Sequence, residues 1–125
     1  MGGYFIEGTK NTPKVTFDIE KHSMSLSGRS MPANTISFYI TIMNWVKQYS
    51  PEEGSNITID IKFSYVNTSS IIALLGILKE FKIHQERNCT VLVTWQYEKN
   101  DEDMVTIGED ISSLCDLGFE LVEYE

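Results

Sequence analysis

The sequence has few of the residues that build covalent cross-links and metal sites. It contains two cysteines and two histidines among 125 residues. Two cysteines cannot form a disulfide framework, and Cys89 and Cys115 each lie among apolar neighbours, so both are expected to be small buried side chains. His22 and His84 lack the spacing of a metal site and are expected at the surface. We therefore predict no metal site and no cofactor.

Long apolar runs and common catalytic motifs are missing as well. No run approaches the 18 apolar residues of a membrane-spanning helix, and no basic-then-apolar export signal opens the chain. A soluble, cytoplasmic protein is expected. The phosphate-binding loop GxxxxGK[ST], the dinucleotide loop GxGxxG and the nucleophile elbow GxSxG do not occur. Because no nucleophile is paired with a base in any recognisable motif, we predict a protein that is not an enzyme.

Positive charge is scarce. Ten basic against 18 acidic residues give a net charge of −8 and a pI of about 4.7. Nucleic acids and anionic membrane surfaces both select clustered Lys and Arg, so neither is an expected partner. The acidic residues between Glu98 and Asp110 leave two interpretations open, because they can bind a cation or a basic partner surface, or form a solvated loop and an acidic first turn of a helix.

The composition that remains is that of an ordinary globular domain. Apolar residues make up 42% of the chain and charged residues 22%, and a chain of this length suits one domain over residues 1–125. Period-two and helical apolar spacing predict the elements. The predicted strands cover residues 4–7, 14–19, 24–27, 56–66, 89–97 and 119–122, and the predicted helices cover residues 32–49, 71–87 and about 107–114.

Several residues define these elements. Pro32 is expected just inside the first helix, where its missing N–H costs nothing. Gly76, in the middle of the second helix, is expected to mark a close approach of that helix to the sheet. Strict alternation in the longest strand predicts that its apolar residues share one face. These residues are Ile57, Ile59, Ile61, Phe63 and Tyr65.

The order of elements predicts the fold class. The second half of the chain alternates strand and helix, which favours parallel pairing through right-handed crossovers. The first half forms a hairpin-like meander, which adds antiparallel strands. We therefore predict a single-domain α/β fold in which a mixed β-sheet is packed with helices.

Four consecutive small polar residues, Asn67 to Ser70, lie between the longest strand and the second helix. One of them is expected to cap the helix by accepting hydrogen bonds from its first N–H groups. The carboxyl end of a strand that opens into a helix N-terminus is also where α/β sheets place binding sites. A hydroxyl here can carry a phosphate at little cost to its own fold, because the positive helix end stabilises the added charge. The segment therefore suggests a cap, a binding switch, or both.

Three stretches resemble one family over nearly the whole chain. They are Tyr65-Val66-Asn67-Thr68-Ser69-Ser70 before a Leu-rich helix, Val93-Thr94-Trp95-Gln96-Tyr97 running into Asp101-Glu102-Asp103-Met104 and Gly108-Glu109-Asp110, and the opening Ile6-Glu7-Gly8-Thr9 with Thr12-Pro13-Lys14-Val15-Thr16-Phe17-Asp18. The chain is therefore similar to the SiaC-type regulatory phosphoproteins. The resemblance implies a STAS-like fold, related to the anti-sigma-factor antagonists, and a partner-switching role.

The resemblance also implies how such a protein works. A cognate Ser/Thr protein kinase phosphorylates the junction threonine, which is Thr68 here, and a PPM-type phosphatase removes the phosphate. The unphosphorylated form binds and stimulates a diguanylate cyclase, which raises cyclic di-GMP and favours biofilm growth. Ser69 and Ser70 are alternative acceptors, and Tyr65, Asn67, Ser69 and Ser70 are the expected partner-binding residues. Two other functions stay open: a small-molecule- or metal-binding α/β domain, and a structural interaction module without phosphorylation.

Overall fold

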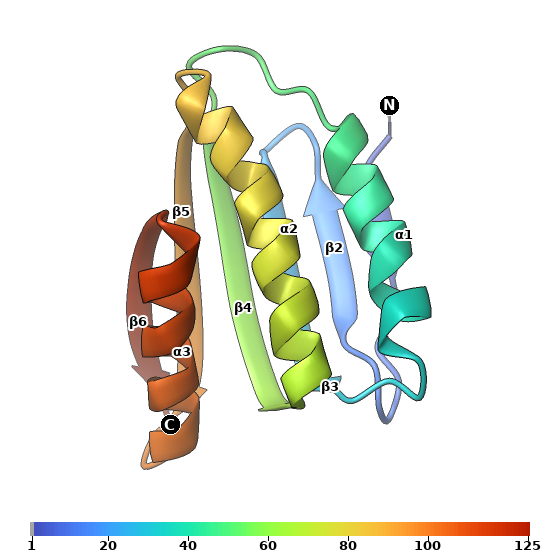
Figure 1. The fold of residues 1–125 in the computed structure, drawn as a ribbon, viewed down its shortest axis with the longest axis vertical. Helices are drawn as coiled ribbons and strands as arrows, with labels where there is room; N and C mark the ends of the chain where they lie inside the picture. The colour runs from blue at the N-terminus through green and yellow to red at the C-terminus, as the bar shows by residue number, and fades with distance from the viewer. Residues whose placement is uncertain (1) are drawn as a thin grey trace.

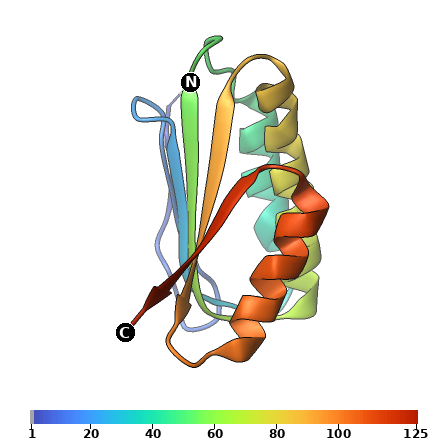
Figure 2. The same cartoon turned by 90° about the vertical axis from the view of Figure 1, so that its left-hand side faces the viewer.

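Six strands and three helices form two layers in the computed structural model, which describes residues 2–125. All three helices cover one face of the sheet (Figure 1, Figure 2). The elements are β1 (Tyr4–Ile6), β2 (Lys14–Asp18), β3 (Ser23–Ser30), α1 (Thr35–Gln48), β4 (Asn56–Val66), α2 (Thr68–Glu86), β5 (Thr90–Glu98), α3 (Glu102–Cys115) and β6 (Gly118–Tyr124).

The strands lie in the sheet in the order of the chain, from β1 to β6. β1, β2 and β3 pair antiparallel, and β3, β4, β5 and β6 pair parallel. The predicted mixed sheet is thus confirmed. Each helix joins two neighbouring parallel strands, and each crossover moves one strand further in the same direction. Crossovers of one hand then place all their helices on one face, as Figure 2 shows.

The core lies between the helices and the inward-facing residues of the central strands. Ile57, Ile59, Ile61 and Phe63 of β4 are at most 1% exposed, and Trp95 of β5 is fully buried. The opposite face of the sheet carries polar pairs such as Asp60 and Gln96. The Asp60 carboxylate accepts a hydrogen bond from Gln96 Nε2 at 2.8 Å. The period-two pattern therefore identified the buried face of β4 as far as Phe63.

The prediction that Tyr65 continues this buried face is wrong. The register between β3 and β4 shifts by one residue, so that Gly28 pairs with Phe63 but Arg29 pairs with Tyr65. The extra residue, Ser64, forms a bulge, and such an insertion reverses the alternation beyond it. Tyr65 is consequently 44% exposed and Val66 is buried. The Arg29 guanidinium lies over the Tyr65 ring, 5.2 Å from its centroid.

Each helix begins away from its predicted start. α1 starts at Thr35, not at Pro32, because the Asn34 side chain caps it by accepting from Ser37 N at 3.0 Å. α2 starts at Thr68, three residues before the first apolar residue of its stripe. α3 starts at Glu102 rather than near Ile107, so part of the acidic segment is helical. α2 and α3 begin earlier than predicted because their first residues are polar and add nothing to the apolar period. α1 begins later because its cap is Asn34, two residues after Pro32.

The close helix-to-sheet approach lies at another glycine than predicted. A Cβ on Gly76 would meet the Met43 methyl of α1 at 3.4 Å, so Gly76 faces the neighbouring helix. A Cβ on Gly108 of α3 would instead lie 2.6 Å from Trp95 Cδ1 of β5. Gly108 is therefore the residue that allows a helix to approach the sheet.

The cysteines and histidines were predicted with mixed success. Cys89 and Cys115 are buried free thiols, as predicted. His84 is only 9% exposed, so its prediction as a surface residue is wrong. Its ring packs edge-on against Tyr49, whose hydroxyl is hydrogen-bonded to the half-buried His22. Within residues 2–125, no helix has both the length and the apolar content that crossing a bilayer demands.

Candidate functional site

The polar junction between β4 and α2 is organised by Asn67. This residue is the N-cap of α2, and its Oδ1 accepts hydrogen bonds from Ser70 N at 2.9 Å and from Ser69 Oγ at 3.3 Å. Its own N–H donates to the Ser30 carbonyl at 3.0 Å, which fixes the turn against β3. The expected capping role is thereby confirmed. The junction lies where the parallel strands end and all three helices begin, at the lower end of Figure 1.

Beneath the junction, three buried hydroxyls form one continuous chain of hydrogen bonds. Ser30 Oγ donates to Ser70 Oγ at 2.9 Å, and Ser70 Oγ donates to the Ser30 carbonyl at 3.3 Å. Because Ser30 has a single proton and gives it to Ser70, the Tyr39 hydroxyl donates to Ser30 Oγ. Ser30 and Ser70 are fully buried and Tyr39 is 3% exposed. Burial raises the pKa of Tyr39, so its phenol stays a neutral donor.

The remaining hydroxyls of the junction face outward. Thr68 and Ser69 are exposed, whereas Ser70 has no accessible surface. Ser69 Oγ is also within 2.8 Å of Thr35 Oγ1, so the first turns of α1 and α2 are joined side chain to side chain. Thr68 is the first residue of α2, next to the unpaired N–H groups and the positive end of the helix. This is an electrostatically favourable place for an anion.

The structure brings together most, but not all, of the predicted site residues. Asn67, Thr68, Ser69 and Ser70 form one cluster. Tyr65 is exposed, but the bulge turns it out of the core beside Arg29. It belongs to a neighbouring patch rather than to the hydroxyl cluster.

Sequence reasoning missed the residues that complete the junction from other elements. Ser30 ends β3, Tyr39 and Thr35 lie in α1, and each bonds a junction residue 31 to 40 positions away, directly or through Ser30. The presence of a serine or tyrosine in an amphipathic segment does not predict which distant residue will be its hydrogen-bond partner. Only the sheet register, which places Ser30 opposite Val66, brings them together.

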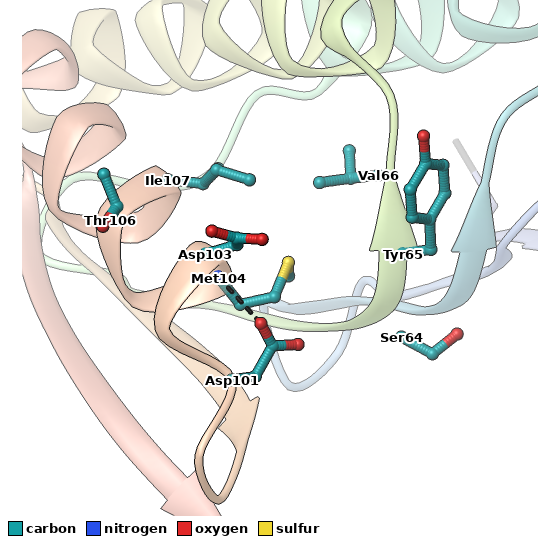
Figure 3. Close-up of a pocket in the computed structure, with 8 residues that line it drawn as sticks. All are labelled: Ser64, Tyr65, Val66, Asp101, Asp103, Met104, Thr106 and Ile107. Atoms are coloured by element: carbon teal, nitrogen blue, oxygen red, sulfur yellow. Dashed lines mark hydrogen bonds between the residues drawn. The ribbon is translucent and has the colours of Figure 1, made fainter.

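A cavity of about 470 Å³ opens beside the junction, between the end of β4 and the start of α3 (Figure 3). Its lining includes Tyr65, Val66, Asp101, Asp103, Met104 and Ile107. Asp101 caps α3, since its Oδ1 accepts from Met104 N at 3.1 Å, and Glu102 and Asp103 lie in the first turn. Part of the acidic segment is thus an acidic helix start, and residues 2–125 contain no cluster of three or more metal-ligating side chains.

Comparison with known proteins identifies the family. The family model described as "SiaC family regulatory phosphoprotein" matches residues 6–124. The chain belongs to this family. The resemblance found in the sequence is therefore confirmed.

Solved SiaC structures have the same fold. The chain is 26% identical to SiaC in the crystal structure of the diguanylate cyclase SiaD in complex with its activator SiaC from Pseudomonas aeruginosa, with a TM-score of 0.87 over 97% of this chain and 99% of that one. Apo-SiaC from the same species matches with a TM-score of 0.85 at 26% identity, over 98% of this chain and 99% of that one. An uncharacterized protein of P. aeruginosa strain UCBPP-PA14 is 25% identical over 100% of this chain and 99% of its own length.

Proposed function

We propose that this SiaC-family protein is a non-enzymatic partner-switching regulator that is reversibly phosphorylated on Thr68. In its unphosphorylated form it binds and stimulates a diguanylate cyclase. The observation that carries the proposal is the match, over 97% of the chain, to a SiaC solved in complex with the diguanylate cyclase SiaD. A small acidic domain without a cluster of candidate metal ligands in residues 2–125 is consistent with a role in binding.

The junction geometry supports Thr68 as the acceptor. Its side chain is exposed at the first position of α2, where a phosphate of charge about −1.5 to −2 is stabilised by the helix end. Ser70 is buried and its hydroxyl both donates and accepts within the Ser30 chain, so phosphorylating it would require the junction to open. Ser69 is exposed, but its hydroxyl is engaged by Asn67 and Thr35.

A reversible switch needs enzymes that add and remove the phosphate. We propose a cognate Ser/Thr protein kinase and a PPM-type phosphatase as these partners, with control of cyclic di-GMP and biofilm growth as the outcome. A kinase consumes ATP and a diguanylate cyclase consumes GTP, so the proposal places the protein in the cytoplasm. Nucleic acid and membrane remain unexpected partners of a domain with a net charge of −8.

The test compares wild type with Thr68→Ala, Thr68→Asp and the matched control Ser69→Ala. Thr68→Ala should fold, bind the cyclase with the affinity of wild type and fail to accept phosphate from the kinase, whereas Ser69→Ala should still accept it. Thr68→Asp should weaken the complex about tenfold or more. The bound partner would bury the new carboxylate without a counter-charge, and this costs more binding free energy than the 1.4 kcal/mol that a factor of ten represents. Mass spectrometry, calorimetry and the cyclase rate provide the readouts.

Three results would contradict parts of the proposal. Phosphate found by mass spectrometry in another segment would remove the site, and an unchanged dissociation constant for Thr68→Asp would remove the charge mechanism. Wild type that leaves the cyclase rate unchanged would argue against activation itself.

The cavity beside the junction favours a small-molecule-binding domain as the second candidate. It lies at the carboxyl ends of parallel strands, where such folds bind ligands, and two carboxylates, those of Asp101 and Asp103, line it. Calorimetry with nucleotides and divalent metals tests this. Submillimolar binding that Asp103→Ala abolishes would favour this function, and no heat of binding would reject it.

A further inference from the structure

The cavity between β4 and α3 has an apolar part and an acidic side. Val66 and Met104 are buried in its lining, at 6% and 4% exposure, and Ile107 is half-buried. Asp101 and Asp103 supply two carboxylates, and in Figure 3 the side chains of Asp103, Met104 and Ile107 point across the cavity toward Val66. Its volume of about 470 Å³ lies within the range of about 300–1,000 Å³ that is usual for ligand sites.

The two carboxylates of the cavity have no cationic partner within residues 2–125. The lining contains no Lys, Arg or His, and the two ion pairs of the described chain, Lys82–Asp116 and Lys99–Glu125, lie elsewhere. A basic side chain from another molecule would therefore compete with no internal cation. Such side chains combine an apolar stem with a charged end, so one of them matches both the apolar part and the acidic side of this cavity.

The cavity lies beside the proposed phosphorylation site. Val66 lines it and precedes Thr68 by two residues, so the Cα atoms of the two are at most about 7 Å apart. That is less than the Debye length of about 8 Å at physiological ionic strength, so a phosphate on Thr68 would act on a cation held in the cavity. Thr68 itself belongs to residues 63–78, a stretch without any charged residue. The carboxylates of the cavity thus add charge to one side of an otherwise uncharged junction.

We propose that the cavity between β4 and α3 docks a basic side chain of the PPM-type phosphatase that removes phosphate from Thr68. The inference rests on the proposed function and adds where this enzyme recognises the protein. In the reaction water attacks phosphorus, the bond to Thr68 Oγ1 breaks, the oxygen regains a proton and inorganic phosphate leaves. The substrate combines the two carboxylates with a phosphate of charge about −1.5 to −2, so it attracts the basic side chain more strongly than the product does. Loss of the phosphate therefore favours release.

The same charges argue against the other two proposed partners at this cavity. A kinase that docked a basic side chain here would bind its phosphorylated product more tightly than its substrate, which would slow product release. The cyclase is proposed to bind the unphosphorylated form, so a basic side chain of the cyclase in the cavity would oppose the switch. The phosphatase is the partner whose substrate carries the most negative charge at this place.

The experiment removes the charge of the carboxylates and keeps their shape. The variants are Asp101→Asn and Asp103→Asn, because asparagine retains an acceptor oxygen with which position 101 can cap α3. The matched control is Asp110→Asn, since Asp110 is an exposed residue of the same helix outside the cavity. Each protein is phosphorylated by the purified kinase, and release of inorganic phosphate by the purified PPM-type phosphatase of the same organism is then measured. Circular dichroism verifies that all variants fold.

Each cavity variant should raise the KM of the phosphatase about fivefold and leave kcat nearly unchanged, because the docking contact is made equally in the bound substrate and in the transition state. In 500 mM NaCl the difference from wild type should shrink, since salt screens the attraction. Asp110→Asn should behave like wild type at every salt concentration. The KM of the kinase should be the same for all four proteins.

The outcomes separate this inference from the proposed function. If the kinase does not phosphorylate wild type on Thr68, or the phosphatase does not remove this phosphate, both fail. If both reactions proceed but Asp101→Asn and Asp103→Asn are dephosphorylated with the KM of wild type, only the inference fails. A raised KM for the kinase with an unchanged KM for the phosphatase would assign the cavity to the kinase, and would likewise overturn the inference.

Discussion

Ser30 is the residue on which the polar junction depends. It accepts from Tyr39, donates to Ser70 and offers its carbonyl to both Ser70 Oγ and Asn67 N. Three elements, β3, α1 and α2, are thus fixed to each other through one serine. The arrangement holds Ser70 inside and leaves Thr68 outside, so two hydroxyl side chains only two positions apart have opposite accessibility.

Removing the Ser30 hydroxyl should cost more than removing that of Tyr39. Ser30→Ala leaves the buried Tyr39 proton without an acceptor and Ser70 Oγ without a donor, which should lower the free energy of unfolding by about 1–3 kcal/mol. Tyr39→Phe leaves the Ser30–Ser70 pair intact and should cost less, about 1 kcal/mol. Urea denaturation followed by tryptophan fluorescence measures both, with the exposed Ser69→Ala as control. Equal losses for the two variants would contradict the direction of the hydrogen bonds.

For single residues, the sequence predicted interactions with neighbours in the chain, but it did not predict interactions with residues that are distant in the chain. A cap among residues 67–70 could be predicted, because a capping side chain and the N–H groups that it binds lie within three residues of each other, and the structure shows that Asn67 is this cap. The burial of His84 and the partners of Ser70 could not, because they depend on side chains that only the tertiary fold brings near.

The elements show where apolar periodicity is informative. It predicted all six strands and three helices, because each element buries one face against the core. It missed the helix starts, where capping side chains take the place of apolar residues, and it missed the bulge at Ser64, because one inserted residue leaves the composition of a strand unchanged. Sequence patterns thus predicted which segments form strands and helices. The directions of the side chains at the end of β4, next to the site, depend instead on the bulge at Ser64.

Two glycines at comparable helical positions should respond in opposite ways to alanine. Gly108→Ala would drive a methyl into Trp95, whose Nε1 donates to Met104 O at 3.0 Å, and should destabilise the protein by about 1–3 kcal/mol. Gly76→Ala meets only the flexible end of Met43 and should be neutral or stabilising by up to about 1 kcal/mol, because alanine favours the helix. Thermal or urea unfolding compares the two, and a larger loss for Gly76→Ala would show that α2, rather than α3, is the tightly packed helix.

For the whole molecule, the distribution of charge matters more than its sum. All of the charged residues that give the net charge of −8 lie outside residues 30–46 and 63–78. The stretches that contain Thr68 and the exposed Ile36, Ile40 and Ile72 therefore carry no charged side chain. A phosphate on Thr68 would add charge to an uncharged surface, whereas the net charge of the whole molecule would change by a much smaller fraction.

This distribution predicts how salt affects the complex. Between 50 and 500 mM NaCl, the dissociation constant of the unphosphorylated protein and its cyclase should change by less than about threefold, because the uncharged stretches around Thr68 offer no charged pair for salt to screen. Fluorescence anisotropy at several salt concentrations measures this. A steep salt dependence would mean that the acidic surface, not the uncharged surface around Thr68, carries the affinity.

The order of the strands has a consequence for how the chain folds during synthesis. Because every strand pairs only with its neighbours in sequence, each new strand that leaves the ribosome meets a partner that has already been made. The sheet can therefore grow from the N-terminus one strand at a time. The junction at Thr68 would take its shape as soon as α2 emerges, since β3 and α1, which hold it, come earlier in the chain.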